Sequence, residues 1–192
     1  MATLLCGVLL ARAERFLTVE KTQKLCFPAA DRFEARTIKF TAEQVKAIQT
    51  ASRQRILNKG NRIWLAWQGT NLQGVIILDH VLGKHEVIDY AVAVNPQGAV
   101  QRVEVLEYRE SHGSDIRNLK WREQFIGKTD QSKLRLNDDV YNISGATISC
   151  RSVTDGVRRV LATFSVVIQP GLAVPAGTDA RRMSDQPAPA TR

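Results

Sequence analysis

A short run of small and hydroxyl-bearing residues toward the C-terminal end of the chain has the composition of a phosphate site. Residues 144–150 read Ser-Gly-Ala-Thr-Ile-Ser-Cys, and over residues 152–167 apolar side chains recur at spacings of three and four. This periodicity predicts a helix with one buried face. The N–H groups at a helix start, together with the positive end of the helix dipole, favour a phosphate. Thr147 stands just ahead of the predicted helix, so its hydroxyl can hold a phosphate or be esterified to one.

The same residues have a simpler interpretation. Serine and threonine side chains that precede a helix commonly cap its first N–H groups. Gly145 and Ala146 favour a ligand, because small residues let a bulky group approach the backbone. On local physics alone, a helix cap and a phosphate site both remain open.

The string Ser-Gly-Ala-Thr resembles the flavin-attachment motif of the FMN-binding domain family. That family includes the flavin subunits of the sodium-pumping NADH:quinone oxidoreductase and of the Rnf complex. In the family, FMN is joined by a phosphoester bond to the threonine that ends the motif, so the resemblance implies Thr147 as the attachment residue. The other cofactor-binding residues that it implies within the motif are Ser144, Gly145, Ala146 and Ser149.

The resemblance covers about residues 31–164, in the order of blocks found in small exported FMN-binding domain proteins. The blocks are Gly-Lys-His-Glu at 83–86, apolar segments at 88–94 and 103–110, and a Trp-to-Lys segment at 121–128. In relatives the loop after the second apolar segment often lies by the flavin ring. The further cofactor contacts that the resemblance implies are Glu110, His112, Gly113 and, near the phosphate charge, Lys128.

Two positions depart from the family pattern. Tyr141 stands where many relatives have an aspartate that the flavin-attaching transferase recognises, and Asp139 lies two residues earlier. Ser-His-Gly at 111–113 replaces the usual Thr-Pro-Gly. The first departure favours an alternative in which flavin binding is weak or lost.

The elements that must position these residues are predicted from periodicity and turn signals. A short helix is predicted at residues 20–25, ended by Pro28, and an extended segment at residues 31–40. Thr41 and Gln44 have the spacing of a capping box, which predicts a helix from there to about Ser52. A turn is predicted at 59–61 and a short helix at 121–127 that carries Trp121 and Phe125 inward. The predicted strands are residues 62–68, 72–80, 87–94 and 99–108.

Short connections between these strands favour antiparallel pairing, with the last two strands forming a hairpin. We therefore predict an α+β fold in which a mainly antiparallel sheet is flanked by helices in a single FMN-binding domain. The charged residues Glu104, Glu107 and Arg109 of the last, alternating strand are expected to face solvent.

The 192 residues, 44% hydrophobic, suit one soluble domain with tails. The net charge of +8 arises from scattered Lys and Arg without a basic aromatic stripe or zinc-finger spacing, which argues against nucleic-acid binding. No apolar run is long enough to span a bilayer. The charge suits an acidic redox partner or an anionic lipid surface.

Three segments are predicted along the chain. Residues 1–13 have an apolar stretch and an Ala-Arg-Ala cleavage pattern typical of a signal peptide, although an amphipathic first helix is the alternative. Residues 14–169 form the FMN-binding domain, and residues 170–192, rich in Pro and Ala, form a disordered tail. Export predicts a periplasmic or otherwise extracytoplasmic location, with membrane association as an option. The sequence leaves open whether Cys26 and Cys150 form a disulfide or are buried thiols.

Other chemistries find little support. His80, His85 and Glu86 lack the spacing of a zinc set and have no cysteine close by, so no metal site is predicted. A serine and a histidine in the loop at 111–115 do not form a nucleophile-elbow motif. No dinucleotide fingerprint or Walker loop is present.

The sequence therefore predicts an exported electron-transfer flavoprotein that carries FMN, through a phosphoester to Thr147. No acid, base or nucleophile stands out, so we expect an electron carrier rather than a stand-alone enzyme. The expected partners are a flavin transferase and a redox protein, either a membrane oxidoreductase or a cytochrome. The alternative function is a non-catalytic binding or sensory module of the same fold.

Overall fold

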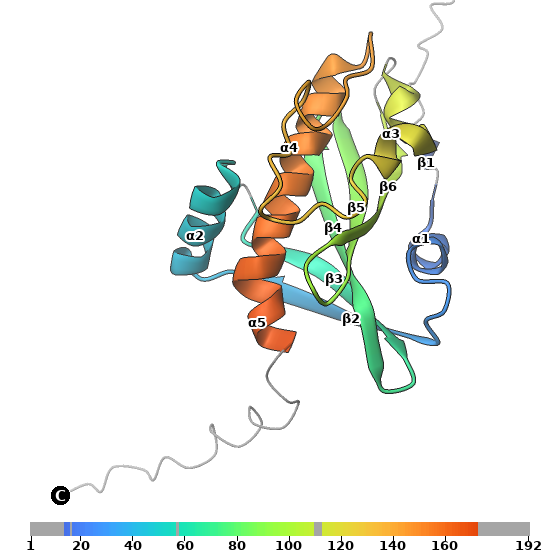
Figure 1. Ribbon diagram of the computed structural model, residues 1–192, viewed down its shortest axis with the longest axis vertical. Helices are drawn as coiled ribbons and strands as arrows, with labels where there is room; N and C mark the ends of the chain where they lie inside the picture. The colour runs from blue at the N-terminus through green and yellow to red at the C-terminus, as the bar shows by residue number, and fades with distance from the viewer. Residues whose placement is uncertain (1–13, 16, 57, 110–112, 173–192) are drawn as a thin grey trace, which may run out of the picture.

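The computed structural model describes residues 14–15, 17–56, 58–109 and 113–172. A six-stranded antiparallel sheet forms the centre, in the order β1-β6-β5-β4-β3-β2 (Figure 1). The strands are β1 (Glu14–Arg15), β2 (Arg32–Lys39), β3 (Gly60–Gln68), β4 (Asn71–Leu82), β5 (Val87–Val94) and β6 (Val100–Tyr108). The helices are α1 (Val19–Cys26), α2 (Ala42–Ser52), η1 (Ser114–Arg117), α3 (Leu119–Glu123), α4 (Thr147–Thr163), η2 (Phe164–Ile168) and α5 (Gln169–Leu172).

The α+β architecture and the β5–β6 hairpin are as predicted. The predicted turn at 59–61 is wrong in part, because Gly60 and Asn61 belong to β3. β2 continues to Lys39, which pairs with Gly60, so the ladder extends over residues whose types favour a turn. The capping box is confirmed: the Gln44 N–H donates to Thr41 Oγ1, and the Thr41 N–H donates to Gln44 Oε1.

The sheet separates two hydrophobic cores. The larger core lies under α4 and includes Cys150, Trp121 and Phe125, so the inward orientation predicted for the last two is confirmed. The smaller core lies under α1 and includes Cys26 and Trp64. Both cysteines are unpaired and buried. Because they lie in separate cores, the buried-thiol alternative is the correct one.

A buried polar network joins α4 to the sheet. The Tyr90 hydroxyl donates to Asp79 Oδ2 at 2.6 Å, and Arg159 Nη2 donates to the same oxygen at 2.6 Å. Burial, reinforced by the Asp79 carboxylate, raises the pKa of Tyr90 well above its ordinary value. Gly156 lets α4 pack directly against Tyr90, because a β-carbon at this position would overlap the Tyr90 hydroxyl.

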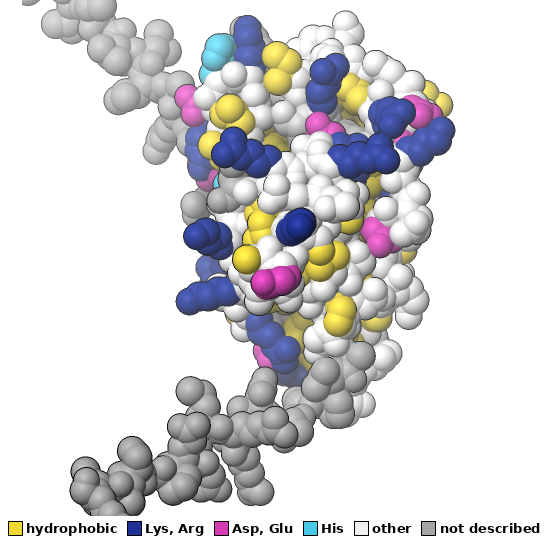
Figure 2. Space-filling view, turned by 90° about the vertical axis from the view of Figure 1, so that its left-hand side faces the viewer, with side chains coloured by type: hydrophobic (Ala, Val, Ile, Leu, Met, Phe, Trp, Pro, Cys, Tyr) yellow, Lys and Arg dark blue, Asp and Glu magenta, His cyan; other side chains and the backbone are white. Residues whose placement is uncertain are grey.

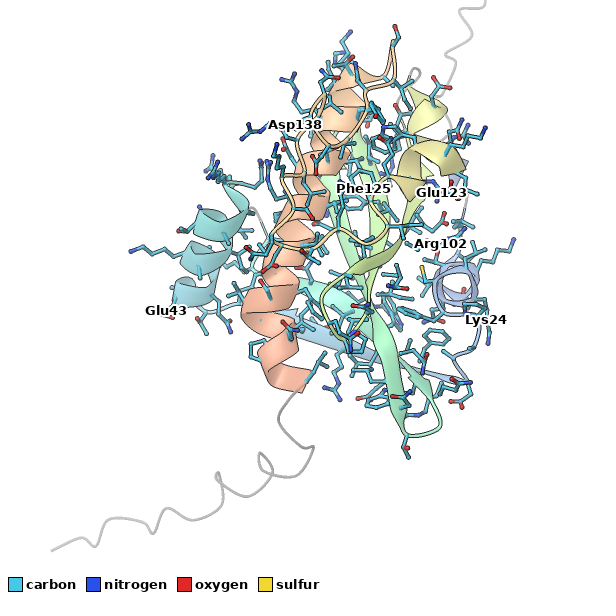
Figure 3. All side chains as sticks on the ribbon, in the orientation of Figure 1. Lys24, Glu43, Arg102, Glu123, Phe125 and Asp138 are labelled. Atoms are coloured by element: carbon cyan, nitrogen blue, oxygen red, sulfur yellow. The ribbon has the colours of Figure 1, made fainter. Side chains whose placement is uncertain are left out.

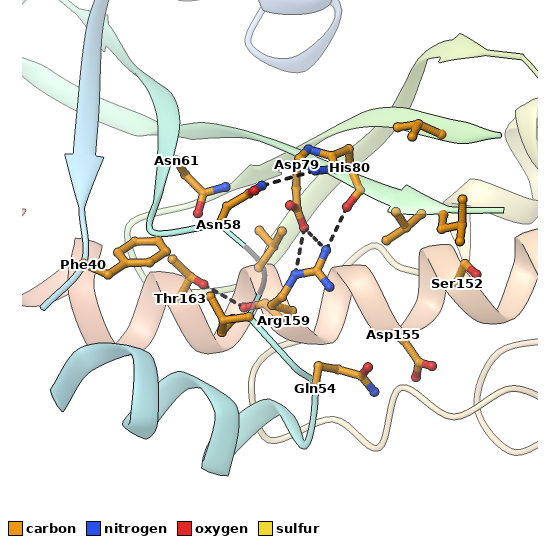
Figure 4. Close-up of a pocket in the computed structure, with 15 residues that line it drawn as sticks. Phe40, Gln54, Asn58, Asn61, Asp79, His80, Ser152, Asp155, Arg159 and Thr163 are labelled. Carbon is orange, nitrogen blue, oxygen red and sulfur yellow. Dashed lines mark hydrogen bonds and ion pairs between the residues drawn. The ribbon is translucent and has the colours of Figure 1, made fainter. Parts of the chain in front are cut away.

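A cavity of about 380 Å³ lies beside this network, between α4 and β4 (Figure 4). Figure 4 shows the Arg159 guanidinium reaching across it to Asp79 and His80. Its lining residues on α4 begin at Ser152. The cavity is therefore separate from the Ser-Gly-Ala-Thr motif.

The segment around α3 covers the outer edge of β6. Arg122 Nη1 donates to the Val103 carbonyl at 2.6 Å, and the Val100 N–H donates to the Lys128 carbonyl at 2.9 Å. Edge groups of the sheet are thereby paired. Figure 3 shows Arg102 between α3 and α1 on this side of the molecule.

The expectation that Glu104 of β6 faces solvent is wrong. Its side chain is buried rather than solvent-facing, with 3% exposure, because Arg102 and Arg122 bond to its two carboxylate oxygens. Glu107 is partly buried and pairs with Arg109.

On the face that carries α2 and α4, Lys and Arg side chains lie in several separate groups (Figure 2). Within the described residues, no helix has the length and apolar character needed to cross a membrane.

Candidate functional site

The Ser-Gly-Ala-Thr motif forms the turn that leads into α4. Gly145 adopts the left-handed conformation with φ of 83°, and Ala146 is the N-cap residue. The Cys150 N–H donates to the Ala146 carbonyl at 2.9 Å, which closes the first helical turn. Thr147 is therefore the first residue of α4, not a residue ahead of it, and the sequence-based start was too late.

The start of α4 has no side-chain cap among the described residues. This finding overturns the interpretation of the motif as an ordinary Ser/Thr cap. The first N–H groups of this 17-residue helix therefore donate to no side-chain cap from the described residues, and the helix dipole adds partial positive charge there. Such a start suits the phosphate of a cofactor.

The motif residues differ in their solvent exposure. Ser144 and Gly145 are exposed, and a β-carbon on Gly145 would meet no atom within 4 Å. Ala146 is buried, and Ser149 is 5% exposed with its Oγ 3.1 Å from the Tyr108 hydroxyl. The open side of the turn therefore lies at Ser144 and Gly145, whereas Ser149 braces α4 against β6.

Thr147 is held by a residue that sequence reasoning missed. Asn142 Nδ2 donates to Thr147 Oγ1 at 2.9 Å, and the threonine is half-buried. Asn142 Oδ1 is buried without a partner among the described residues. No sequence signal marks Asn142, since its role depends on the turn that brings residues five apart together.

The loop after β6 reaches the motif at Gly113. A β-carbon on Gly113, which has φ of 84°, would lie 2.8 Å from the Tyr108 hydroxyl, 3.3 Å from Ser149 Oγ and 3.5 Å from Ala146 Cα. Gly113 therefore packs directly on the start of α4. Glu110 and His112, the other two predicted contacts in this loop, lie outside the described residues.

Lys128 has a partner in the loop that precedes the motif. Its Nζ donates to Asp139 Oδ2 at 2.9 Å, and the same carboxylate accepts from the N–H groups of Leu134 and Arg135. Burial would raise the pKa of Asp139, but these hydrogen bonds hold it below its ordinary value. Lys128 thus anchors this loop, and its contact with a phosphate stays a prediction.

The backbone of Tyr141, just ahead of the motif, is hydrogen-bonded to the segment around α3. The Tyr141 N–H donates to Gln124 Oε1 at 2.6 Å, and its carbonyl accepts from Trp121 Nε1 at 2.8 Å. The side chain is 78% exposed. The nearest aspartate, Asp139, is engaged by Lys128 and by two backbone N–H groups.

The comparisons agree with this geometry. The model of the FMN-binding domain family matches residues 83–162, which span β5, β6, the motif and nearly all of α4. Among solved structures, NqrC of Shewanella oneidensis is similar with a TM-score of 0.58 and 16% identity, over 80% of this chain and 96% of that one. A search of curated proteins found no match.

The likeness to NqrC shows a shared fold, and the family match covers the segments that build the site. FMN is the cofactor that this match indicates. Residues 83–162 of this chain therefore resemble an FMN-binding domain, and the start of α4 lies within the matched segment.

Proposed function

We propose that this chain is an electron-transfer flavoprotein whose FMN is joined through its phosphate to Thr147. The observation that carries the proposal is the uncapped start of α4, with the Thr147 hydroxyl at its first position. An FMN-binding domain supports an FMN-carrying electron-transfer role. The phosphoester would form between the phosphate and Thr147 Oγ1, with net loss of one water from FMN and the hydroxyl.

The residues around Thr147 suit this attachment. First-turn N–H groups would hold phosphate oxygens, and the Asn142 amide would hold the bridging oxygen. Gly145 leaves space beside the ester, and Gly113 lets the loop after β6 pack close. Bound FMN supplies one- and two-electron redox chemistry. The printed side-chain partners of Thr147 and Ser149 are the Asn142 amide and the Tyr108 hydroxyl, which suits a carrier more than an enzyme.

The proposal includes partners and a location. A separate flavin transferase would attach the cofactor, and residues 1–13 would direct export to an extracytoplasmic compartment. There the protein would pass electrons between a membrane oxidoreductase or cytochrome and an acceptor. The basic net charge supports an acidic redox partner.

The intact mass of the protein tests the attachment. Protein co-expressed with a flavin transferase should be yellow after denaturation, and its mass should rise by FMN minus one water on the peptide that contains Thr147. Thr147→Ala should abolish the adduct, whereas Ser152→Ala, one turn farther along α4, should retain it. Covalent flavin that persists in Thr147→Ala would show that the attachment residue is wrong.

Tyr141 favours the second candidate, a binding or sensory module with weak or lost flavin. If this candidate is correct, the co-expressed protein stays colourless and does not take up added FMN. If Tyr141 only hinders the transferase, Tyr141→Asp should raise the fraction of protein with the adduct. The exposed side chain at this position makes the substitution tolerable for the fold.

A further inference from the structure

A groove lies between α1 and α3, over β6 and away from the open side of the motif. It has a volume of about 330 Å³, and the lining residues that matter are Leu25, Arg102, Glu104, Arg117, Leu119 and Arg122. We call it the α1–α3 groove. A small adjoining hollow shares Arg102, Leu119 and Arg122 with it and adds Ile126 and Glu123.

Exposed apolar side chains gather at this groove. Leu25 is 42% exposed, Leu119 46% and Ile126 52%. They come from α1, from α3 and from the segment after α3, and the two hollows bring them to one surface. Single exposed apolar residues need no explanation, but a group of them around a groove is typical of an interaction site.

The charges at the groove are arranged to favour an acidic ligand. Glu104 is buried, with Arg102 Nε 2.5 Å from one carboxylate oxygen and Arg122 Nη1 2.6 Å from the other. The Glu104 carboxylate is therefore neutralised from within, and the two hollows together have three guanidinium groups, with Arg117, against two carboxylates, with Glu123. The described contact of Arg102 uses Nε, and its side chain is 31% exposed, so its outer nitrogens can receive a carboxylate.

We propose that the α1–α3 groove binds an acidic segment of a partner protein, with carboxylates on the arginines and apolar side chains on Leu119 and Ile126. Neither of the two undescribed end segments of this sequence is acidic. Residues 1–13 contain no Asp or Glu, and residues 173–192 contain more Arg than Asp. A second copy is disfavoured by the net charge of +8.

The position of α3 connects this surface to the cofactor site. Trp121 of α3 donates its indole N–H to the Tyr141 carbonyl, just ahead of the motif. A partner in the groove would therefore lie on the far side of α3 from the segment that leads into α4. The proposal does not depend on whether FMN is covalently bound.

Peptide selection tests the proposal without any flavin. A library of random short peptides is selected on the full chain, and the enriched peptides are measured by fluorescence anisotropy at low and at physiological salt. We expect enriched peptides to be acidic and to carry apolar residues. Arg102→Gln, Leu119→Ser and Ile126→Ser should each weaken their binding by about tenfold, because buried anchors and paired charges dominate such interfaces.

Matched controls lie elsewhere on the surface. Lys46→Gln on α2 removes one exposed charge, and Leu82→Ser removes an apolar side chain that is 62% exposed. Both should leave binding unchanged. Arg102→Gln keeps Arg122 on Glu104, and the two serine variants change only exposed positions, so a thermal melt should show folded proteins. Enrichment of neutral or basic peptides, or binding that the groove variants do not alter, would overturn the proposal.

Discussion

The single residue that decides the candidate chemistry is Thr147, and its neighbours determine what its hydroxyl can do. This threonine is the first residue of a helix that has no side-chain cap among the described residues, so it lies beside the first-turn N–H groups, and Asn142 donates to its oxygen. A hydrogen bond to this oxygen orients the hydroxyl and would stabilise negative charge that develops there as the ester forms. Asn142 is thus a positioning residue for Thr147.

Asn142→Ala should slow attachment of FMN to Thr147 by about tenfold, since one lost hydrogen bond of about 1.4 kcal/mol changes a rate by that factor. Asn142→Asp should slow it as well, because the carboxylate has the size of the amide but no N–H donor. The measurement is the fraction of protein with the FMN adduct over time, by intact mass. The control Asn58→Ala lies beside the separate cavity and should attach FMN at the normal rate. A normal rate of FMN attachment in Asn142→Asp would show that the N–H donor of Asn142 is not needed.

At the scale of elements, α4 does two tasks through two of its parts. Its first turn offers the anchor for the cofactor, and its middle packs on the sheet through Gly156, over Tyr90 and Val81. The network of Tyr90, Asp79 and Arg159 fixes the rotation of the helix about its axis. This rotation determines that Ser149 meets Tyr108 and that the motif turn faces outward.

Gly156→Ala should destabilise the protein although alanine is the better helix former. Alanine gains about 1 kcal/mol of helix propensity, but its methyl group would overlap the Tyr90 hydroxyl and lie 2.8 Å from Val81 Cγ1. We expect a net loss of about 2 kcal/mol from this overpacking, measured by urea unfolding. Thr50→Ala, at an exposed position on α2, provides a gain in propensity of up to about 0.7 kcal/mol without the overlap. Stabilisation by Gly156→Ala would show that α4 does not pack on Tyr90 as described.

For the whole molecule, the sheet is a partition between two cores of different size. Cys150 lies in the core under α4 and Cys26 in the core under α1, so no disulfide connects the two sides. Folding therefore depends on burial and on the strand ladder. Burial, with a further contribution from Glu104, raises the pKa of the Cys26 thiol to about 12, despite the opposing charges of Arg102 and Arg122.

This pKa makes global stability sensitive to alkaline pH. The unfolded thiol has a pKa of 9.0, so the contribution of Cys26 is fully present below that pH and is lost as pH rises toward 12. Between pH 8 and pH 10 the free energy of unfolding should fall by about 1.4 kcal/mol more in the wild type than in Cys26→Ala. Urea titrations under reducing conditions measure the difference. Parallel pH profiles for the two proteins would contradict a buried thiol at this site.

Much of the architecture could be predicted because it depends on patterns of residues that are close together in the sequence. Runs of β-branched and aromatic residues between turn signals predicted four strands close to their observed bounds, and Thr41 with Gln44 predicted the start of α2. The turn at Gly60 was mispredicted because a strand partner overrode local preference. Glu104 was misassigned to solvent because alternation identifies the two faces of a strand but not what covers each face.

The sequence by itself determined the strand and helix segments, the Ser-Gly-Ala-Thr motif and the resemblance that names its cofactor, because these depend on residues that are neighbours in the chain. Only the tertiary structure decided that α4 starts at Thr147 without a cap, that Gly113 packs on this start, and that Asn142 holds the threonine oxygen. Those contacts follow from sheet register and from the way α4 packs on the sheet. Both are set by the packing of side chains far apart in sequence, which no local pattern encodes.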